Sequence, residues 1–179
     1  MGCGSSKING NVVEEKPELT KEQKDTLIQT WQNLHADLER IGMLMFMGLF
    51  EHNPEIKEFF VGADSRDMKT EELRYNEKLQ EHGIRVMGLV EKIISSMGFE
   101  DEKIDQMVVD LGKRHLGYDV HIPFIDLFGR QFVFAIKPTL HTHWTANVEE
   151  AWTQLFKYIG YLMRYGYHTK LQQVQKKNS

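Results

Sequence analysis

The sequence predicts an all-α fold, for three reasons. Only four prolines occur among 179 residues, and runs of alternating β-branched residues, which favour strands, are few. Apolar residues instead recur at steps of three and four, the spacing that places them on one face of a helix. The length suits one domain with a sizeable core and is too short for two. We therefore expect a single helical domain.

The first two helices are predicted from a capping signal and from apolar stripes. Thr20, followed three residues later by Gln23, resembles a capping box, so a helix is expected over residues 20–34. A second helix is expected over residues 36–51. Its methionines could ligate a metal through sulfur, but methionine more often fills gaps in a core, and core packing is the preferred interpretation.

A short helical turn is expected over residues 54–60, where a proline occupies the first turn. Polar residues and a glycine then predict a surface loop over residues 62–70. The next helix, expected over residues 71–97, carries His82. Gly83 beside the histidine costs helix stability of about 1 kcal/mol relative to alanine, which suits a place where this helix crosses another at close range.

Three further segments complete the predicted domain. A helix over residues 101–116 carries His115 and is ended by the glycine that follows. The next helix is expected over residues 122–137, with proline in its first turn. A turn over residues 138–145 precedes the last helix, which is expected over residues 147–173. Lysines near its carboxyl end favour this placement.

Composition and charge exclude several classes of function. The formal net charge is -4, so the chain lacks the basic surface of a nucleic-acid-binding protein, and we expect no nucleic-acid partner. The longest uncharged stretch, residues 41–50, is too short to span a bilayer, which takes about 20 apolar residues. With one cysteine, Cys3, no internal disulfide can form, and a reducing compartment is expected.

The first six residues carry a separate signal. Gly2 after the first methionine, with Ser6 at the sixth position, fits the pattern for N-myristoylation. Cys3 beside the glycine is a candidate for palmitoylation. One myristoyl chain binds membranes only weakly, at about 10⁴ M⁻¹, and no basic cluster follows, so Cys3 is the second anchor that stable attachment would require. The alternative is an unmodified flexible tail.

These observations divide the chain into three parts. A flexible, acylated tail is expected over residues 1–19, a globular domain over residues 20–172 and a frayed carboxyl terminus over residues 173–179. Residues 8–17 are polar and rich in asparagine, lysine and glutamate, so we expect them to form a disordered spacer. Residues that could bind a cofactor are expected in the globular domain, over residues 20–172.

Two histidines are the candidate ligands for a cofactor. His82 and His115 each lie on the apolar stripe of a separate predicted helix, and no catalytic acid or nucleophile accompanies either one. A single histidine on such a face is more often a hydrogen-bonded core residue. Neutral imidazole is also a common ligand for iron, zinc and copper, and a flat cofactor held between two helices would need two of them. The pair therefore favours a ligand role over the core alternative.

The segments around the two histidines resemble the globin family over roughly residues 20–170. The distance along the chain between His82 and His115 is close to that between the distal and proximal histidines of globins. The resemblance is carried by these residues and segments: Trp31, Asn53-Pro54-Glu55, Phe59-Phe60, Leu79-Gln80-Glu81-His82-Gly83, Leu111-Gly112-Lys113-Arg114-His115 and Trp152. It implies a globin fold of roughly seven or eight helices that encloses a haem pocket.

The resemblance implies an axial role for each histidine. It places His115 at the proximal position, where Nε2 would bind the iron of haem b, an iron protoporphyrin IX. A metal-bound histidine usually donates its other ring N–H to an acceptor, and the carbonyl of Leu111, four residues earlier, is the natural partner. His82 takes the distal position, where it would either donate a hydrogen bond to bound dioxygen or coordinate the iron directly. The sequence leaves that choice open.

Further pocket residues follow from the resemblance. We expect additional haem contacts from Phe46, Phe60, Val86, Val120 and Phe124, although ordinary core packing predicts the same burial for the two aromatic residues of the distal side. Arg85 could pair with a haem propionate or, equally, with Glu81 one turn earlier on its own helix. His121 is a weaker candidate for the propionate.

Among globins, an amino-terminal Met-Gly-Cys is similar to the membrane-associated branch called globin X. This similarity implies a haem protein tethered by acyl chains to the cytoplasmic face of the plasma membrane, with an additional cytosolic pool. Its expected role is redox or signalling at the membrane, such as electron transfer, nitrite reduction or protection against lipid oxidation, served by an unidentified reductase. The alternative is reversible binding of dioxygen or another diatomic gas for storage, transport or sensing. A helical scaffold without haem is the third hypothesis.

Overall fold

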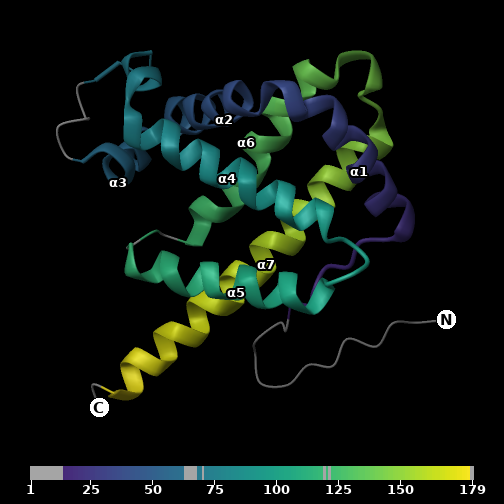
Figure 1. Cartoon of the computed structure of the whole chain (residues 1–179). Coiled ribbons are helices and arrows are strands. Elements are labelled where there is room, and N and C mark those ends of the chain that lie inside the picture. Colours follow the sequence, from purple (N-terminus) through teal and green to yellow (C-terminus); the bar gives the residue numbers. More distant parts are fainter. Residues whose placement is uncertain (1–13, 63–67, 70, 119, 121, 178–179) are drawn as a thin grey trace.

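The computed structural model describes residues 14–62, 68–69, 71–118, 120 and 122–177. The described residues form helices and connecting segments, and the predicted all-α fold is confirmed. The α-helices, shown in Figure 1, are α1 (Lys21–Leu34), α2 (Leu38–His52), α3 (Lys57–Val61), α4 (Glu77–Ser95), α5 (Asp101–Gly117), α6 (Ile122–Leu140) and α7 (Ala146–Lys177). Short 3₁₀ turns in the connections are η1 (His35–Asp37), η2 (Pro54–Ile56), η4 (Glu72–Tyr75) and η5 (His141–His143).

The core forms where α1, α2, α6 and α7 pack together. α2 packs on both α4 and α6, and α7 packs on α1, α5 and α6. Trp152, Phe46, Phe50 and Phe132 are among the largest fully buried side chains. The Trp152 indole stacks on Phe132 with ring centroids 5.6 Å apart and donates a hydrogen bond to the Thr30 hydroxyl at 3.1 Å. The buried indole N–H therefore keeps a partner inside the core.

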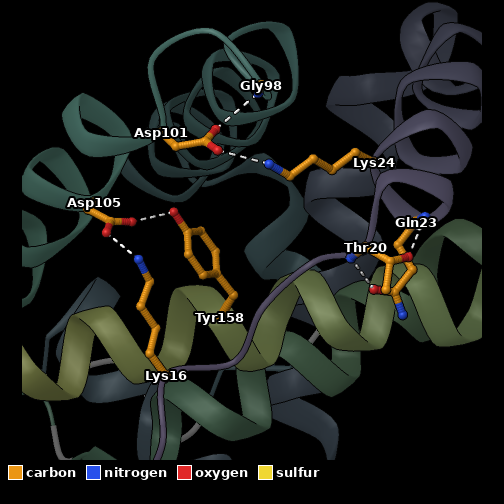
Figure 2. A network of polar contacts seen from close by, with 8 residues as sticks. All are labelled: Lys16, Thr20, Gln23, Lys24, Gly98, Asp101, Asp105 and Tyr158. Atoms are coloured by element: carbon orange, nitrogen blue, oxygen red, sulfur yellow. Dashed lines mark hydrogen bonds and ion pairs between the residues drawn. The ribbon is translucent and has the colours of Figure 1, made fainter.

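α1 begins where the sequence predicts. The backbone N–H of Gln23 donates to Thr20 Oγ1 at 3.2 Å, and the backbone N–H of Thr20 donates to Gln23 Oε1 at 3.0 Å (Figure 2). Both bonds of the capping box are thus present. The helix ends at Leu34, also as predicted.

The helix that carries His82 starts later than predicted. The expected segment over residues 71–97 is divided into the turn η4 and helix α4, because Asn76 between them has an extended backbone (φ -77°, ψ 113°). Its side-chain oxygen accepts a hydrogen bond from the N–H of Leu79 at 3.1 Å, so Asn76 caps α4. This cap lies inside a long apolar pattern, where the sequence gives only a weak signal for the start of a helix.

The last two helices both extend beyond their predicted ends. α6 passes through Pro138 and ends at Leu140, where we expected a stop at the residue before the proline. Pro138 has no N–H for the carbonyl of Phe134, but Phe134 is 73% exposed, so water can satisfy that carbonyl. α7 continues to Lys177, and its last turn is basic, which suits a helix carboxyl end. Among the described helices, none is both long and apolar enough to cross a bilayer.

Two glycine crossings place the helices that carry the histidines. At the crossing of α2 and α4, a Cβ on Gly42 would lie 3.5 Å from the Cα of Gly83, which confirms the close approach expected at Gly83. The crossing of α5 and α7 is tighter. A Cβ on Gly112 would lie 2.0 Å from the carbonyl oxygen of Met163, and a Cβ on Gly166 would lie 2.0 Å from that of Val109. The backbones of α5 and α7 are therefore in direct contact.

Replacing Gly112 by alanine should destabilise the protein, because the added methyl group meets backbone rather than a flexible side chain. We expect a loss of about 2 kcal/mol in the free energy of unfolding, within the usual cost of overpacking. Gly88→Ala is the matched control, since nothing lies within 4 Å of a Cβ at Gly88 in α4. That control should be neutral or slightly stabilising. Urea unfolding of both variants measures the difference, and equal stabilities would contradict the tight crossing.

Candidate functional site

His115 lies in the last turn of α5, one turn beyond the crossing with α7. Its Nδ1 donates a hydrogen bond to the carbonyl of Leu111 at 2.9 Å, as the sequence predicts. A carbonyl can only accept, so Nδ1 carries the proton and Nε2 keeps its lone pair. Burial lowers the pKa of His115, although the bond to Leu111 partly opposes that effect and the charge of Arg114 adds to it. The imidazole is therefore neutral at pH 7, with Nε2 free to bind a metal.

His82 lies in α4 beside the glycine crossing with α2. Its ring centroid is 5.4 Å from that of Phe46 and 5.1 Å from that of Phe60. Burial, followed by the charges of Arg85 and His115, lowers its pKa to about 4. An imidazole with this pKa is neutral at pH 7 and available as a ligand.

The two histidines belong to helices that are supported separately. α4 packs mainly on α2 and α1, whereas α5 packs mainly on α7. The positive charge that His115 carries when protonated would lower the pKa of His82, so the two rings lie within electrostatic range of each other. Two neutral imidazoles on two independently held helices fit a flat, metal-containing group between them. The sequence predicts this same pair as haem ligands, and the ligation itself stays a prediction.

A metal at this site would need donors beyond the two histidines. Within the part of the chain that the structure describes, no group of three or more histidine, cysteine, aspartate or glutamate side chains could hold a metal ion. An all-protein zinc or copper site would need more ligands than this pair supplies. A porphyrin provides four nitrogens of its own, so the donor set suits haem iron with one or two axial histidines.

The predicted pocket residues are distributed over four helices and one loop. Phe46 of α2 is fully buried, and Phe60 of α3 is partly buried with its ring 5.1 Å from that of Phe46. Val86 lies one turn after His82 in α4 and is partly buried. Val120, in the loop after α5, donates its backbone N–H to the carbonyl of His115 at 3.3 Å. The structure thus brings these residues around the histidines, and their contacts with haem stay predictions.

Phe124 and Arg85 are the remaining predicted pocket residues that the structure describes. Phe124 of α6 is partly buried, with its ring centroid 6.0 Å from that of Phe59. Arg85 Nη2 lies 3.9 Å from Glu81 Oε2, and both side chains are about two-thirds exposed. Of the two partners expected for Arg85, a haem propionate or Glu81, the structure shows Glu81. Because both side chains are exposed to solvent, this ion pair is weak. His121, the other propionate candidate, lies outside the described residues.

Two aromatic residues near the histidines were not predicted as site residues. Tyr118 follows α5, and its ring contacts His115 edge-on with centroids 6.1 Å apart. Phe128 of α6 contacts Phe46 with centroids 6.1 Å apart. Helical spacing could have indicated both, because Tyr118 is three residues after His115 and Phe128 is four residues after Phe124.

The acylation candidates Gly2 and Cys3 lie outside the described residues. The structure therefore bears on the cofactor site and not on the lipid anchor. The anchor stays a prediction from the sequence.

Comparisons with a family model, with related sequences and with solved structures all match this chain to globins. The family model for globins matches residues 44–163. Cytoglobin-2 of Danio rerio is 24% identical over 144 residues, which are 79% of this chain and 79% of that protein. Neuroglobin of Chaenocephalus aceratus is 21% identical over 150 residues, which are 84% of this chain and 93% of that protein. The structure of a hexacoordinated haem protein from an anhydrobiotic tardigrade matches with a TM-score of 0.76 and 20% identity, covering 85% of this chain and 97% of that chain.

The two histidines should respond differently to substitution. His115→Ala should abolish stable haem binding, because the proximal bond is the protein's anchor to iron whenever a ligand occupies the other side. His82→Leu should retain haem and change its axial ligation, which absorption spectra report. His35→Ala is the control, since that side chain is 65% exposed and pairs only with Glu91 among the described residues. Titration of haem into each variant measures the affinity, and full affinity in His115→Ala would disprove the proximal assignment.

Proposed function

The chain belongs to the globin family, and on that premise we propose that it binds haem b with His115 and His82 as the two axial ligands. The observation that carries the proposal is that burial keeps both imidazoles neutral on two separately supported helices. Relatives among the neuroglobins and the hexacoordinated tardigrade protein, which shares the fold, support the same assignment. The iron of a bound haem would take diatomic gases and exchange electrons.

The protein side chains have distinct tasks in this proposal. The hydrogen bond from His115 Nδ1 to the carbonyl of Leu111 fixes the ring and its tautomer, so Nε2 is the nitrogen that would bind the cofactor. Phe46 and Phe60 flank His82 and exclude water from its ring. His82 would then compete with any external ligand for a haem iron. Such competition lowers the apparent affinity for the ligand by the fraction of protein in the open state.

We propose further that the protein works at the cytoplasmic face of the plasma membrane, which the similarity of its amino terminus to the globin X branch implies. The support is the Met1-Gly2-Cys3 start and Ser6, which suit dual acylation. A protein fixed to a surface cannot carry oxygen across the cytoplasm, but it can act on oxidants, lipid peroxides or nitrite at that surface. Such chemistry would draw electrons from a reductase.

Reversible dioxygen binding is the second candidate function. A neutral His82 retains one ring N–H, which could donate to a bound gas if the ring leaves the iron. The visible spectrum of the ferrous protein distinguishes the two proposals. Sharp, resolved bands indicate two nitrogen ligands, whereas one broad band indicates five-coordinate iron.

Carbon monoxide kinetics test whether His82 ligates. If it does, His82→Leu should bind carbon monoxide faster than the parent, because no internal ligand has to leave first. The parent rate should reach a plateau at high ligand concentration, set by dissociation of His82, and the variant rate should stay linear. Flash photolysis or rapid mixing measures both. A parent rate that is linear throughout and equal to that of the variant would show that His82 never binds the iron.

Cell fractionation tests the membrane anchor. Gly2→Ala should move the protein to the cytosol, because myristoylation requires glycine at the exposed amino terminus. Cys3→Ser should release most of it, since a single acyl chain holds weakly. Gly4→Ala retains both modified positions and is the matched control. Hydroxylamine, which cleaves thioesters, should release the parent protein, whereas high salt should not. A Gly2→Ala protein that stays in the membrane pellet would place the anchor elsewhere.

A further inference from the structure

Residues 14–19, which we call the N-terminal strap, are attached to the helical domain by side-chain contacts. The carbonyl of Glu18 accepts a hydrogen bond from Gln154 Nε2 at 3.0 Å. Glu14 Oε1 lies 2.7 Å from Arg164 Nη2. Both partners belong to α7. The strap is thus attached to α7 at two positions ten residues apart on that helix, or about 15 Å at 1.5 Å per residue.

The strap also reaches α5 through Lys16. The ammonium group of Lys16 pairs with one carboxylate oxygen of Asp105, and the hydroxyl of Tyr158 donates to the other oxygen at 2.5 Å (Figure 2). The same ammonium lies over the Tyr158 ring, 5.4 Å from its centroid. Burial and the nearby Asp105 raise the pKa of Tyr158, so the phenol stays protonated and keeps donating. One carboxylate of α5 is therefore held by the strap and by α7 together.

Arg164 extends the attachment to α6. Its Nη1 donates to Asp126 Oδ1 at 2.5 Å while its Nη2 binds Glu14, and the arginine side chain is only 19% exposed. Gly160 leaves room for this pair, because a Cβ there would lie 3.1 Å from Arg164 Nη1 and 3.3 Å from Asp126 Oδ1. The strap consequently contacts α5 and α7 directly and is linked to α6 through Arg164.

Asp105 and His115 lie on opposite sides of the point where α5 crosses α7, so the contacts of Asp105 can affect the position of His115. α5 crosses α7 near Val109 and Gly112. At 1.5 Å per residue, Asp105 lies about 8 Å before the middle of that crossing and His115 lies about 7 Å beyond it. A second contact, from Lys24 to Asp101 at 2.9 Å, holds the same end of α5 (Figure 2). A small rotation of α5 about the crossing would therefore move Asp105 and His115 by similar distances in opposite directions.

We propose that Lys16 and Tyr158, acting through Asp105, are positioning residues for His115. They set the tilt of α5 about the glycine crossing, and so the balance between one and two axial histidines on the iron. Binding geometry has to be held within roughly 0.5 Å, and the distance between His82 and the iron depends on this tilt. The inference rests on the proposed haem ligation and assigns the tail of the chain a role besides membrane attachment.

Lys16→Met and Tyr158→Phe test the proposal in the full-length protein. Each keeps most of the side chain and removes one bond to Asp105. In the haem-loaded protein, we expect each substitution to change the carbon monoxide plateau rate about threefold, the size expected for a partly exposed ion pair. Lys16→Arg, which preserves the charge, should restore the parent value.

Lys103→Met is the matched control. Lys103 lies on α5 close to Asp105, but its ammonium pairs with Glu100, at the start of the same helix. Like Lys16→Met, this substitution removes one lysine charge, but it leaves the contacts between α5 and the strap in place. The plateau rate of carbon monoxide binding should therefore not change. Equal rates in the parent, Lys16→Met and Tyr158→Phe would overturn the positioning role. An equal change in Lys103→Met would overturn it as well, because general charge would then explain the effect.

Two further measurements separate this proposal from the proposed ligation. In the His82→Leu background the ferrous iron has His115 as its axial histidine, so the iron–histidine stretching frequency in Raman spectra reports on His115 alone. Lys16→Met should shift that frequency even if His82 never binds. Amide hydrogen exchange of the apoprotein should also be faster in the last turns of α5 when Lys16 is replaced. If the parent binds no haem, the proposed function fails, and unchanged exchange would then overturn the strap's role too.

Discussion

The contact on which the site depends most is the crossing of α5 and α7 at Gly112 and Gly166. A Cβ at either glycine would lie 2.0 Å from a backbone oxygen of the other helix, so the two helices meet along their main chains. Because α5 packs on α7 in this way, it does not need α4 for support. A second glycine crossing, between α2 and α4, holds the other side. His82 and His115 therefore lie on two helices that are each supported mainly by packing against other helices.

The electrostatic properties of the site follow from the same packing. Both histidines are partly buried, and burial is the main cause that lowers the pKa of each. Neutral imidazoles are the form that binds iron, so the fold selects the ligand state without a dedicated acid or base. His115 also has its ring fixed by a bond within its own helix. His82 is flanked by aromatic rings instead, and this difference suits one permanent and one displaceable ligand.

The amino-terminal part of the chain combines two roles in our proposals. The first residues resemble an acylation signal, whereas residues 14–19 contact the domain through Glu14, Lys16 and Glu18. From the sequence alone, residues 8–17 are expected only as a polar spacer. Its polar composition is compatible with both, because charged side chains that would be solvated in a free tail can also pair with charges on a folded surface. The nearest such charges, on α5 and α7, come from residues far along the chain.

Local features of this protein were determined by the sequence itself. The capping box at Thr20 and the bond from His115 to the carbonyl of Leu111 join residues three or four apart, so adjacent sequence encodes them, and helical periodicity placed both histidines on apolar faces. The helix start after Asn76 was missed, because a cap inside a continuous apolar pattern leaves only a weak signal. Tertiary structure alone decided which helices approach closely and that the strap meets α5. These outcomes depend on packing between residues far apart in the chain, which no short window of sequence contains.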